Sequence, residues 1–188
     1  MGDYTQSSIT IIDWPRGTMV PVEMLEDIED HLIPEDPRAG VAVEAIILNL
    51  LDLSGYRTTD YGFPMSDAEL LDALREGATF TQEQTSYDAV SNIEDRLIEL
   101  GCTFEAHFEP KYEWDGEVIV GTPGFPVFRT TANSDGSEYT MDSLIVDWLE
   151  ESADLDDFRR RFEEHSGKEV TDAVNAIRER LAQGADLP

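Results

Sequence analysis

The spacing of apolar residues predicts a strand followed by helices in the first third of the chain. Residues 8–15 alternate in polarity up to Pro15, which indicates a strand with at least one buried face. Segments 20–33 and 40–54 have apolar side chains at helical spacing. The second is the most apolar segment, so we expect it at the centre of the core. Residues 55–64 are expected to form a loop.

A capping pattern marks the next predicted helix. Ser66 is followed three residues later by Glu69, which is capping-box spacing, and Gly77 is a stop signal. A polar connector is expected after Gly77. A third helix is predicted over residues 86–100, and the residues expected to face inward are Tyr87, Val90, Ile93, Leu97 and Leu100.

After Gly101 the apolar period changes to two, which is typical of strands. Asp115-Gly116 is a hairpin signal, so the pattern predicts an antiparallel β-meander of three or four strands. The expected strands include 103–109, 111–114, 117–121 and 127–132.

The chain is predicted to end in helices at 141–151, 155–165 and 168–183. The last two have apolar stripes and are separated by a tight joint at residues 166–168, so a C-terminal helical hairpin is expected. The fold class is therefore α+β, with a helical centre, a β-meander and this hairpin. We expect an acidic domain over residues 1–151 and the hairpin over 152–188.

The order of helices 40–54, 66–76 and 86–100 with a hairpin after them resembles a winged helix-turn-helix over residues 40–131. In that family the third helix usually enters the major groove and the hairpin touches phosphate. The resemblance implies a winged-helix-like centre whose contact surface is the outward stripe of the third helix. That stripe consists of Asp88, Ser91, Asn92, Asp95 and Glu99.

The charge of this stripe argues against DNA binding. Phosphate contacts need Lys or Arg, but Arg96 is the only base of the third helix, and the hairpin region adds only Lys111 and Arg129. We therefore expect no direct contact with nucleic acid and interpret the stripe as a surface for a protein partner. The alternative is that the stripe is simply solvated surface.

The whole chain is strongly acidic, with 41 acidic against 13 basic residues among 188 and a net charge of −28. Three explanations remain open. Acidic surfaces suit a halophile, because molar salt screens their self-repulsion. Carboxylates also stand in for phosphates in DNA mimics, and an acidic face fits a basic protein partner.

The C-terminal segment departs from this acidity, because six of the 13 bases lie within residues 159–180. Such asymmetry favours a contact surface. The candidate residues are Phe158, Arg159, Arg160, Arg161 and Phe162, which would dock on an acidic partner or on another copy of the chain. The alternative is that these arginines pair with the chain's own acids.

The sequence offers little chemistry. His31, His107 and His165 lie on separate predicted elements, and the single Cys102 has neither a disulfide partner nor zinc-site spacing. No phosphate-binding loop is recognisable. We therefore expect no catalytic residues, no metal, no cofactor and no enzymatic activity.

The chain has no apolar run long enough for a membrane span, and its first residues lack the pattern of a signal peptide. We expect a cytoplasmic protein, or a virion component if it is viral. The leading interpretation is a non-enzymatic protein–protein interaction protein with possible self-association. A viral structural or assembly protein, or a protein of a halophile, would fit this profile.

Two other functions stay open. One is a DNA mimic that inhibits a nuclease, a restriction system or a repressor. The other is a halophilic winged-helix transcription regulator, in which the basic C-terminal segment would have to carry the DNA contact.

Overall fold

A computed structural model of the chain describes residues 5–25, 34, 36, 39–58, 65–85, 91–110, 115–133, 138, 140 and 142–184. Its strands are β1 (Thr5–Asp13), β2 (Met19–Val20), β3 (Val41–Ala42), β4 (Arg57–Thr58), β5 (Thr79–Thr85), β6 (Thr103–Phe108), β7 (Gly116–Gly121) and β8 (Phe128–Ala132). Its helices are the 3-10 turn η1 (Val22–Met24), α1 (Val43–Leu53), α2 (Asp67–Arg75), α3 (Ser91–Glu99), α4 (Asp142–Glu151), α5 (Leu155–His165) and α6 (Lys168–Ala182).

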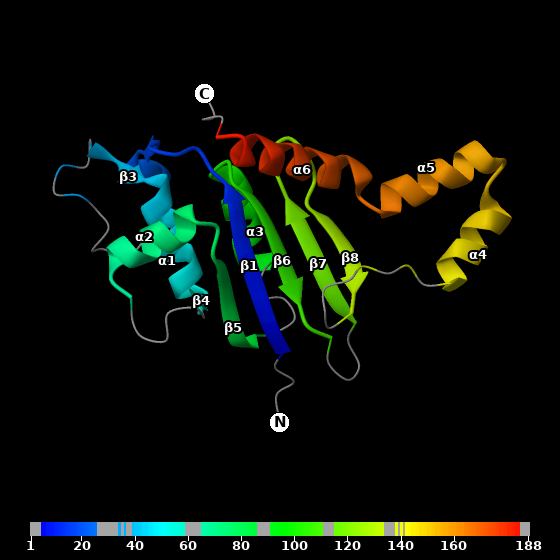
Figure 1. Cartoon of the computed structure of the whole chain (residues 1–188), viewed down its shortest axis with the longest axis horizontal. Helices are drawn as coiled ribbons and strands as arrows, with labels where there is room; N and C mark the ends of the chain where they lie inside the picture. Colours follow the sequence, from blue (N-terminus) through cyan, green and yellow to red (C-terminus); the bar gives the residue numbers. More distant parts are fainter. Residues whose placement is uncertain are drawn as a thin grey trace.

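The described strands form a six-stranded antiparallel sheet in the order β4-β5-β1-β6-β7-β8, beside a small β2-β3 pair. Strand β1 is central, and its Ile9 pairs with Phe80 of β5 on one side and with Ala106 of β6 on the other. Helices α1, α2 and α3 lie on one face of the sheet, and α6 crosses the other (Figure 1). The α+β fold and the β6-β7-β8 meander are therefore confirmed.

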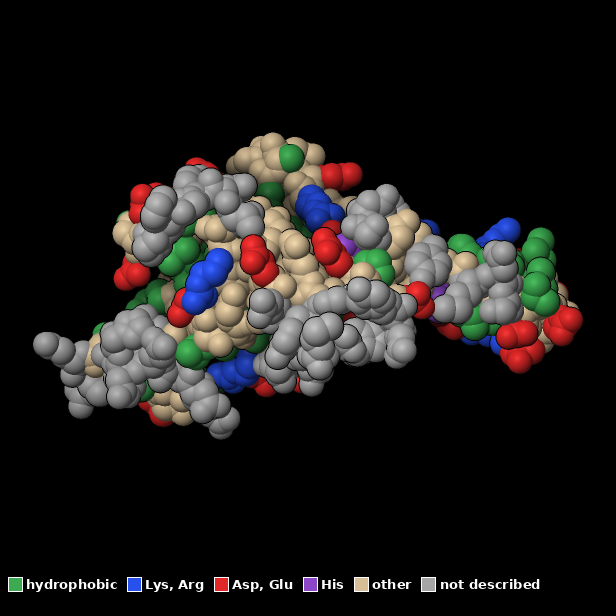
Figure 2. Space-filling view, turned by 90° about the horizontal axis from the view of Figure 1, so that it is seen from below, with side chains coloured by type: hydrophobic (Ala, Val, Ile, Leu, Met, Phe, Trp, Pro, Cys, Tyr) green, Lys and Arg blue, Asp and Glu red, His purple; other side chains and the backbone are tan. Residues whose placement is uncertain are grey.

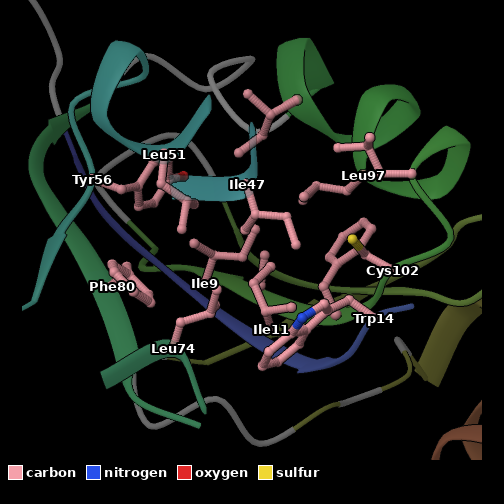
Figure 3. Packing of buried hydrophobic residues seen from close by; sticks show 14 of the residues in the cluster. Ile9, Ile11, Trp14, Ile47, Leu51, Tyr56, Leu74, Phe80, Leu97 and Cys102 are labelled. Atoms are coloured by element: carbon pink, nitrogen blue, oxygen red, sulfur yellow. The ribbon is translucent and has the colours of Figure 1, made fainter. Parts of the chain in front are cut away.

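The main core lies between the sheet and α1, α2 and α3. Strands have period two, so Ile9 and Ile11 of β1 point to the same face and meet Ile47 and Leu51 of α1 (Figure 3). All four side chains are at most 1% exposed. Burial of apolar surface contributes about 25 cal/mol per Å², so the predicted central position of this helix follows from its apolar composition.

A second, smaller core lies on the opposite face of the sheet. Val118 and Val120 of β7 are buried there against Val170 and Val174 of α6. An ion pair of 2.7 Å between Arg178 and Glu105 also joins α6 to β6. Helix α6 therefore forms a layer that packs on this face of the sheet.

The predicted polar connector after Gly77 is wrong, because residues 79–85 form β5. Phe80 is the buried apolar residue of this strand, and most of the others are polar. Its backbone is held by pairing with β1 on one side and with β4 on the other. Pairing with a distant strand leaves no local apolar pattern, so the sequence did not indicate a strand at residues 79–85.

Two local predictions also differ from the structure. The predicted helix 20–33 begins instead with β2 and the short η1, and residues 26–33 lie outside the described residues. Gly116 lies within β7, opposite Ala132 of β8, and not in a two-residue turn. The predicted strand 111–114 lies outside the described residues.

The C-terminal helix pair is present, but its two helices follow one another along the molecule instead of folding back (Figure 1). Gly167 links them in a left-handed conformation with φ of 57°. The apolar stripe of α6 is used by the sheet, so it is not free to cover α5. Helix α5 packs against α4 through the rings of Trp148 and Phe162.

Candidate functional site

Helices α4 and α5 form a two-helix arm, residues 142–165, which projects beyond the β8 edge of the sheet (Figure 1). We refer to it as the α4–α5 arm. Figure 2 shows the arm standing clear at one end of the molecule, with apolar side chains beside acidic ones. An element in this position is accessible to a partner from several sides.

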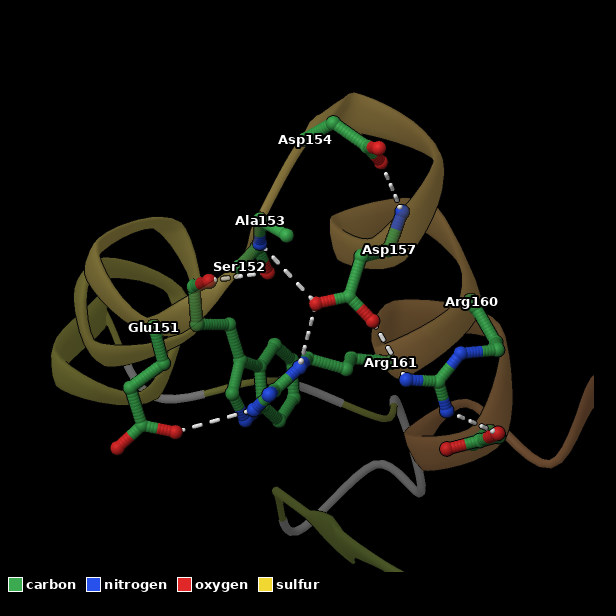
Figure 4. Close-up of polar contacts among 9 residues, drawn as sticks. Glu151, Ser152, Ala153, Asp154, Asp157, Arg160 and Arg161 are labelled. Carbon is green, nitrogen blue, oxygen red and sulfur yellow. Dashed lines mark hydrogen bonds and ion pairs between the residues drawn. The ribbon is translucent and has the colours of Figure 1, made fainter.

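A short polar turn folds α4 back onto α5 (Figure 4). The Asp154 carboxylate caps α5 by accepting a hydrogen bond of 2.9 Å from the Asp157 amide. The Asp157 carboxylate in turn accepts one of 3.2 Å from the Ala153 amide. On the α4 side, the Ser152 hydroxyl donates to the Trp148 carbonyl oxygen at 2.5 Å. These local bonds satisfy some of the free backbone groups at the two helix ends.

Aromatic side chains join the two helices. The Trp148 ring meets Phe162 edge-on, with centroids 6.5 Å apart, and it meets His165 at 4.8 Å. Phe158 stacks on Phe162 within α5. Edge-on and offset pairs of this kind are favourable beyond their buried area. The arm therefore has a small aromatic seam of its own.

The three arginines of the predicted contact surface pair with acids inside the arm. The pairs are Arg159–Asp156 at 3.8 Å, Arg160–Asp157 at 2.5 Å, Arg160–Glu164 at 2.8 Å and Arg161–Glu151 at 3.0 Å. The hydrogen bond from Arg160 is the main reason why the pKa of Asp157 lies below its usual value. The structure therefore agrees with the second alternative, in which these arginines pair with the chain's own acids.

Exposed apolar side chains are the more distinctive feature of the arm. Among the described residues, four of the eight large hydrophobic side chains that are exposed lie on it: Val146 at 51%, Leu149 at 57%, Leu155 at 68% and Phe162 at 41%. Residues three or four apart share a helix face, so Val146 and Leu149 lie together on α4. Leu155 and Phe162, seven apart, share a face of α5.

Sequence reasoning selected Phe162 but missed Val146 and Leu149. A signal was available, because five of the six residues from Leu144 to Leu149 are apolar. A helix that packs on only one side needs an apolar stripe along that side, which is narrower than a run of five apolar residues in six. Trp148 lies on the side of α4 that packs against α5, while Val146 and Leu149 lie on the outer side of α4.

The predicted acidic stripe on α3 is only partly visible. Asp88 and the side chains of Ser91 and Asn92 lie outside what the structure describes. Asp95 is exposed, and so is Glu99, whose carboxylate pairs with Arg96 at 2.7 Å.

The neighbouring Glu94 faces inward and is only 5% exposed. Its two carboxylate oxygens accept hydrogen bonds of 2.5 and 2.6 Å from Arg129 of β8, which also pairs with Glu117 of β7 at 2.9 Å. Arg129 was expected to be a base of the hairpin surface. In the structure it anchors α3 over the β7-β8 edge of the sheet, and sequence spacing gave no indication of this contact.

No cluster of three or more His, Cys, Asp or Glu side chains that could hold a metal ion occurs among the described residues. Burial raises the pKa of the Cys102 thiol to about 12, so this side chain stays protonated and is a poor nucleophile at neutral pH. Within the described ranges, no helix is long and apolar enough to cross a membrane.

Comparison with known proteins adds no family to this picture. No protein-family model matches the chain, and neither a curated protein nor a solved structure matches it. The winged-helix resemblance therefore has no independent support, and the function has to be argued from the surfaces described above.

Proposed function

We propose that this chain is a non-enzymatic protein–protein interaction protein whose partner docks on the α4–α5 arm. The observation that carries the proposal is the exposed apolar surface of Val146, Leu149, Leu155 and Phe162 on an element that stands clear of the sheet. Apolar patches rimmed by polar residues mark interaction sites on soluble proteins. Covering them removes apolar area from water, which favours binding.

The charges around this surface indicate the class of partner. Asp147 and Glu150 are exposed close to the apolar side chains, while the arginines of the arm are already paired. The net charge of −28 opposes the approach of a second copy at low salt. A basic partner that presents apolar side chains, such as a basic amphipathic helix, fits both the patch and its rim.

The test begins by locating the partner. A photo-crosslinking amino acid replaces Leu149 on the arm in one full-length variant and Leu53 on α1 in a control variant. Leu53 is a matched control because it is 52% exposed and lies on another element. We expect a specific cross-link from position 149 alone. Equal cross-linking from both positions would contradict a docking surface on the arm.

The purified partner is then titrated with the wild-type chain and with a Val146→Ser/Leu149→Ser variant. Each buried leucine or valine is worth about 1.5–3 kcal/mol, and tenfold in Kd corresponds to about 1.4 kcal/mol. We therefore expect Kd to rise by at least about tenfold, with Leu53→Ser near wild type. An unchanged Kd for the arm variant would overturn the proposal. If the partner is another copy of the chain, sedimentation would show self-association.

A further inference from the structure

A cleft of about 600 Å³ lies between α1 and α2, at the margin of the main core, against which Leu48 and Leu70 also pack. Its wall includes Leu48 of α1 with Leu70 and Leu71 of α2, and its volume is in the range of small-molecule sites. It is separate from the α4–α5 arm, so it concerns a second activity of the chain.

Asn49 borders this cleft and is only 7% exposed. Its side-chain amide offers one donor group and one acceptor to whatever occupies the cleft.

Glu44 supplies a charge in the same cleft. This residue is 8% exposed, and its Oε1 accepts a hydrogen bond of 3.1 Å from the Gly17 amide. Burial opposes its ionisation, but hydrogen bonds, that from Gly17 first among them, hold the pKa below its usual value, so the carboxylate is charged at neutral pH.

Among the described residues no base lies within ion-pair distance of this carboxylate. Arg75 also borders the cleft, and its charge contributes to the lowered pKa of Glu44, but its ion pair at 3.4 Å is with Asp72. A carboxylate that is buried and charged is stabilised further by a cation that reaches it.

We propose that the α1–α2 cleft binds a small organic cation, an amine or guanidinium group on an apolar body. The cationic group faces Glu44 and hydrogen-bonds the Asn49 amide oxygen. The apolar body lies against Leu48, Leu70 and Leu71. The combination of one buried carboxylate, one side-chain amide and an apolar wall selects this class over anions and over neutral apolar molecules.

The test uses phenethylamine as the probe and follows the backbone amide of Gly17 and the side-chain amide of Asn49 in the full-length protein by NMR. The comparison ligands are 2-phenylethanol and phenylacetate, which have a similar apolar body without the positive charge. Titrations run in about 1 M KCl, where the Debye length of about 3 Å screens binding to surface carboxylates. We expect saturable shifts with the amine, and binding of the alcohol and the acid at least tenfold weaker.

Variants assign the binding to these residues. Charge-assisted hydrogen bonds are roughly twice as strong as neutral ones, so Glu44→Gln should weaken amine binding by about tenfold or more, and Asn49→Leu should also weaken it. Glu76→Gln is the matched control, because Glu76 is an exposed carboxylate at the end of α2 that does not border the cleft.

Ala45→Phe fills the cleft and leaves both polar groups in place, so it tests the site even if Glu44→Gln fails to fold. It should abolish the shifts while circular dichroism stays unchanged. The proposal is overturned if phenethylamine gives no saturable shift, if the alcohol binds as tightly as the amine, or if Glu76→Gln weakens binding as much as Glu44→Gln.

Discussion

At the scale of single residues, the contact between Glu94 and Arg129 decides how α3 sits on the sheet. Glu94 is buried, whereas the Arg129 side chain is 36% exposed, and the two are joined by a pair of short hydrogen bonds. Burial raises the pKa of Glu94, and the charge of Arg129 opposes this rise. The ionised carboxylate is therefore tolerated in this position because its partner is present.

Arg129→Met should lower the free energy of unfolding at pH 7 by about 2–3 kcal/mol, less than for a fully buried pair because Arg129 reaches solvent. The folded-state pKa of Glu94 lies above the ordinary value of 4.5, so ionisation costs stability, and the cost grows as pH rises through the folded-state pKa. Below that pKa the protonated carboxyl has less need of Arg129. Urea unfolding of the variant should therefore show a smaller loss near pH 4 than at pH 7.

The control is the double variant Glu94→Leu/Arg129→Met, which removes both charges. Replacing both members of a buried pair by apolar residues is often neutral, so this variant should lie within about 1 kcal/mol of wild type. An equal loss for Arg129→Met at both pH values would mean that the arginine contributes packing and not charge.

At the scale of elements, Gly167 determines how the arm leaves the sheet. It joins α5 to α6 with φ of 57°, in the left-handed region that favours glycine. A Cβ at this position would come within 2.4 Å of the Phe128 ring of β8. Backbone conformation and close contact with the sheet therefore both require glycine here.

Gly167→Ala should lower the free energy of unfolding by about 2–4 kcal/mol, since it combines a left-handed alanine with overpacking against Phe128. Gly77→Ala is the matched control, because Gly77 has φ of 74° and nothing within 4 Å of an added Cβ. It should cost only the backbone part, about 1–2 kcal/mol. Equal losses for the two variants in urea unfolding would show that the contact with Phe128 is unimportant.

Local sequence signals explain why the helical segments were easier to predict than strand β5. Ser66 and Glu69 form the predicted capping box, with the Glu69 carboxylate accepting from the Ser66 amide at 2.8 Å. Such signals are local in sequence. Strand β5 forms by pairing with β1, which lies about 70 residues earlier in the chain, and the polar residues of β5 give no local signal of a strand.

At the scale of the whole molecule, the net charge of −28 acts on every element at once. Many of the ion pairs in the described part are exposed and contribute little. Folding must therefore overcome a repulsion that salt screens. The salt dependence of stability measures how large this repulsion is.

A titration from about 0.1 M to molar KCl, read by circular dichroism and sedimentation, should show a chain that is already folded at the lowest salt and becomes more stable as the Debye length falls. That result leaves the carboxylates available for a basic partner. A chain that folds only near molar salt would instead mark the acidity as an adaptation to a saline environment. The net charge would then no longer favour a basic partner or DNA mimicry.

The sequence by itself determined the α+β class, the positions of most described helices and the segments of the meander, because caps, glycine stops and apolar periods are local signals. It also determined the acidity and the candidate arginines of the C-terminal segment. Arg159 and Arg160 pair with acids three or four residues away on the same helix. Tertiary structure alone decided that Arg161 reaches Glu151 of α4, that α6 covers the sheet, and that Val146 and Leu149 are left exposed. The physical reason is that each of these outcomes depends on how separate elements pack against one another, which local signals along the chain do not specify.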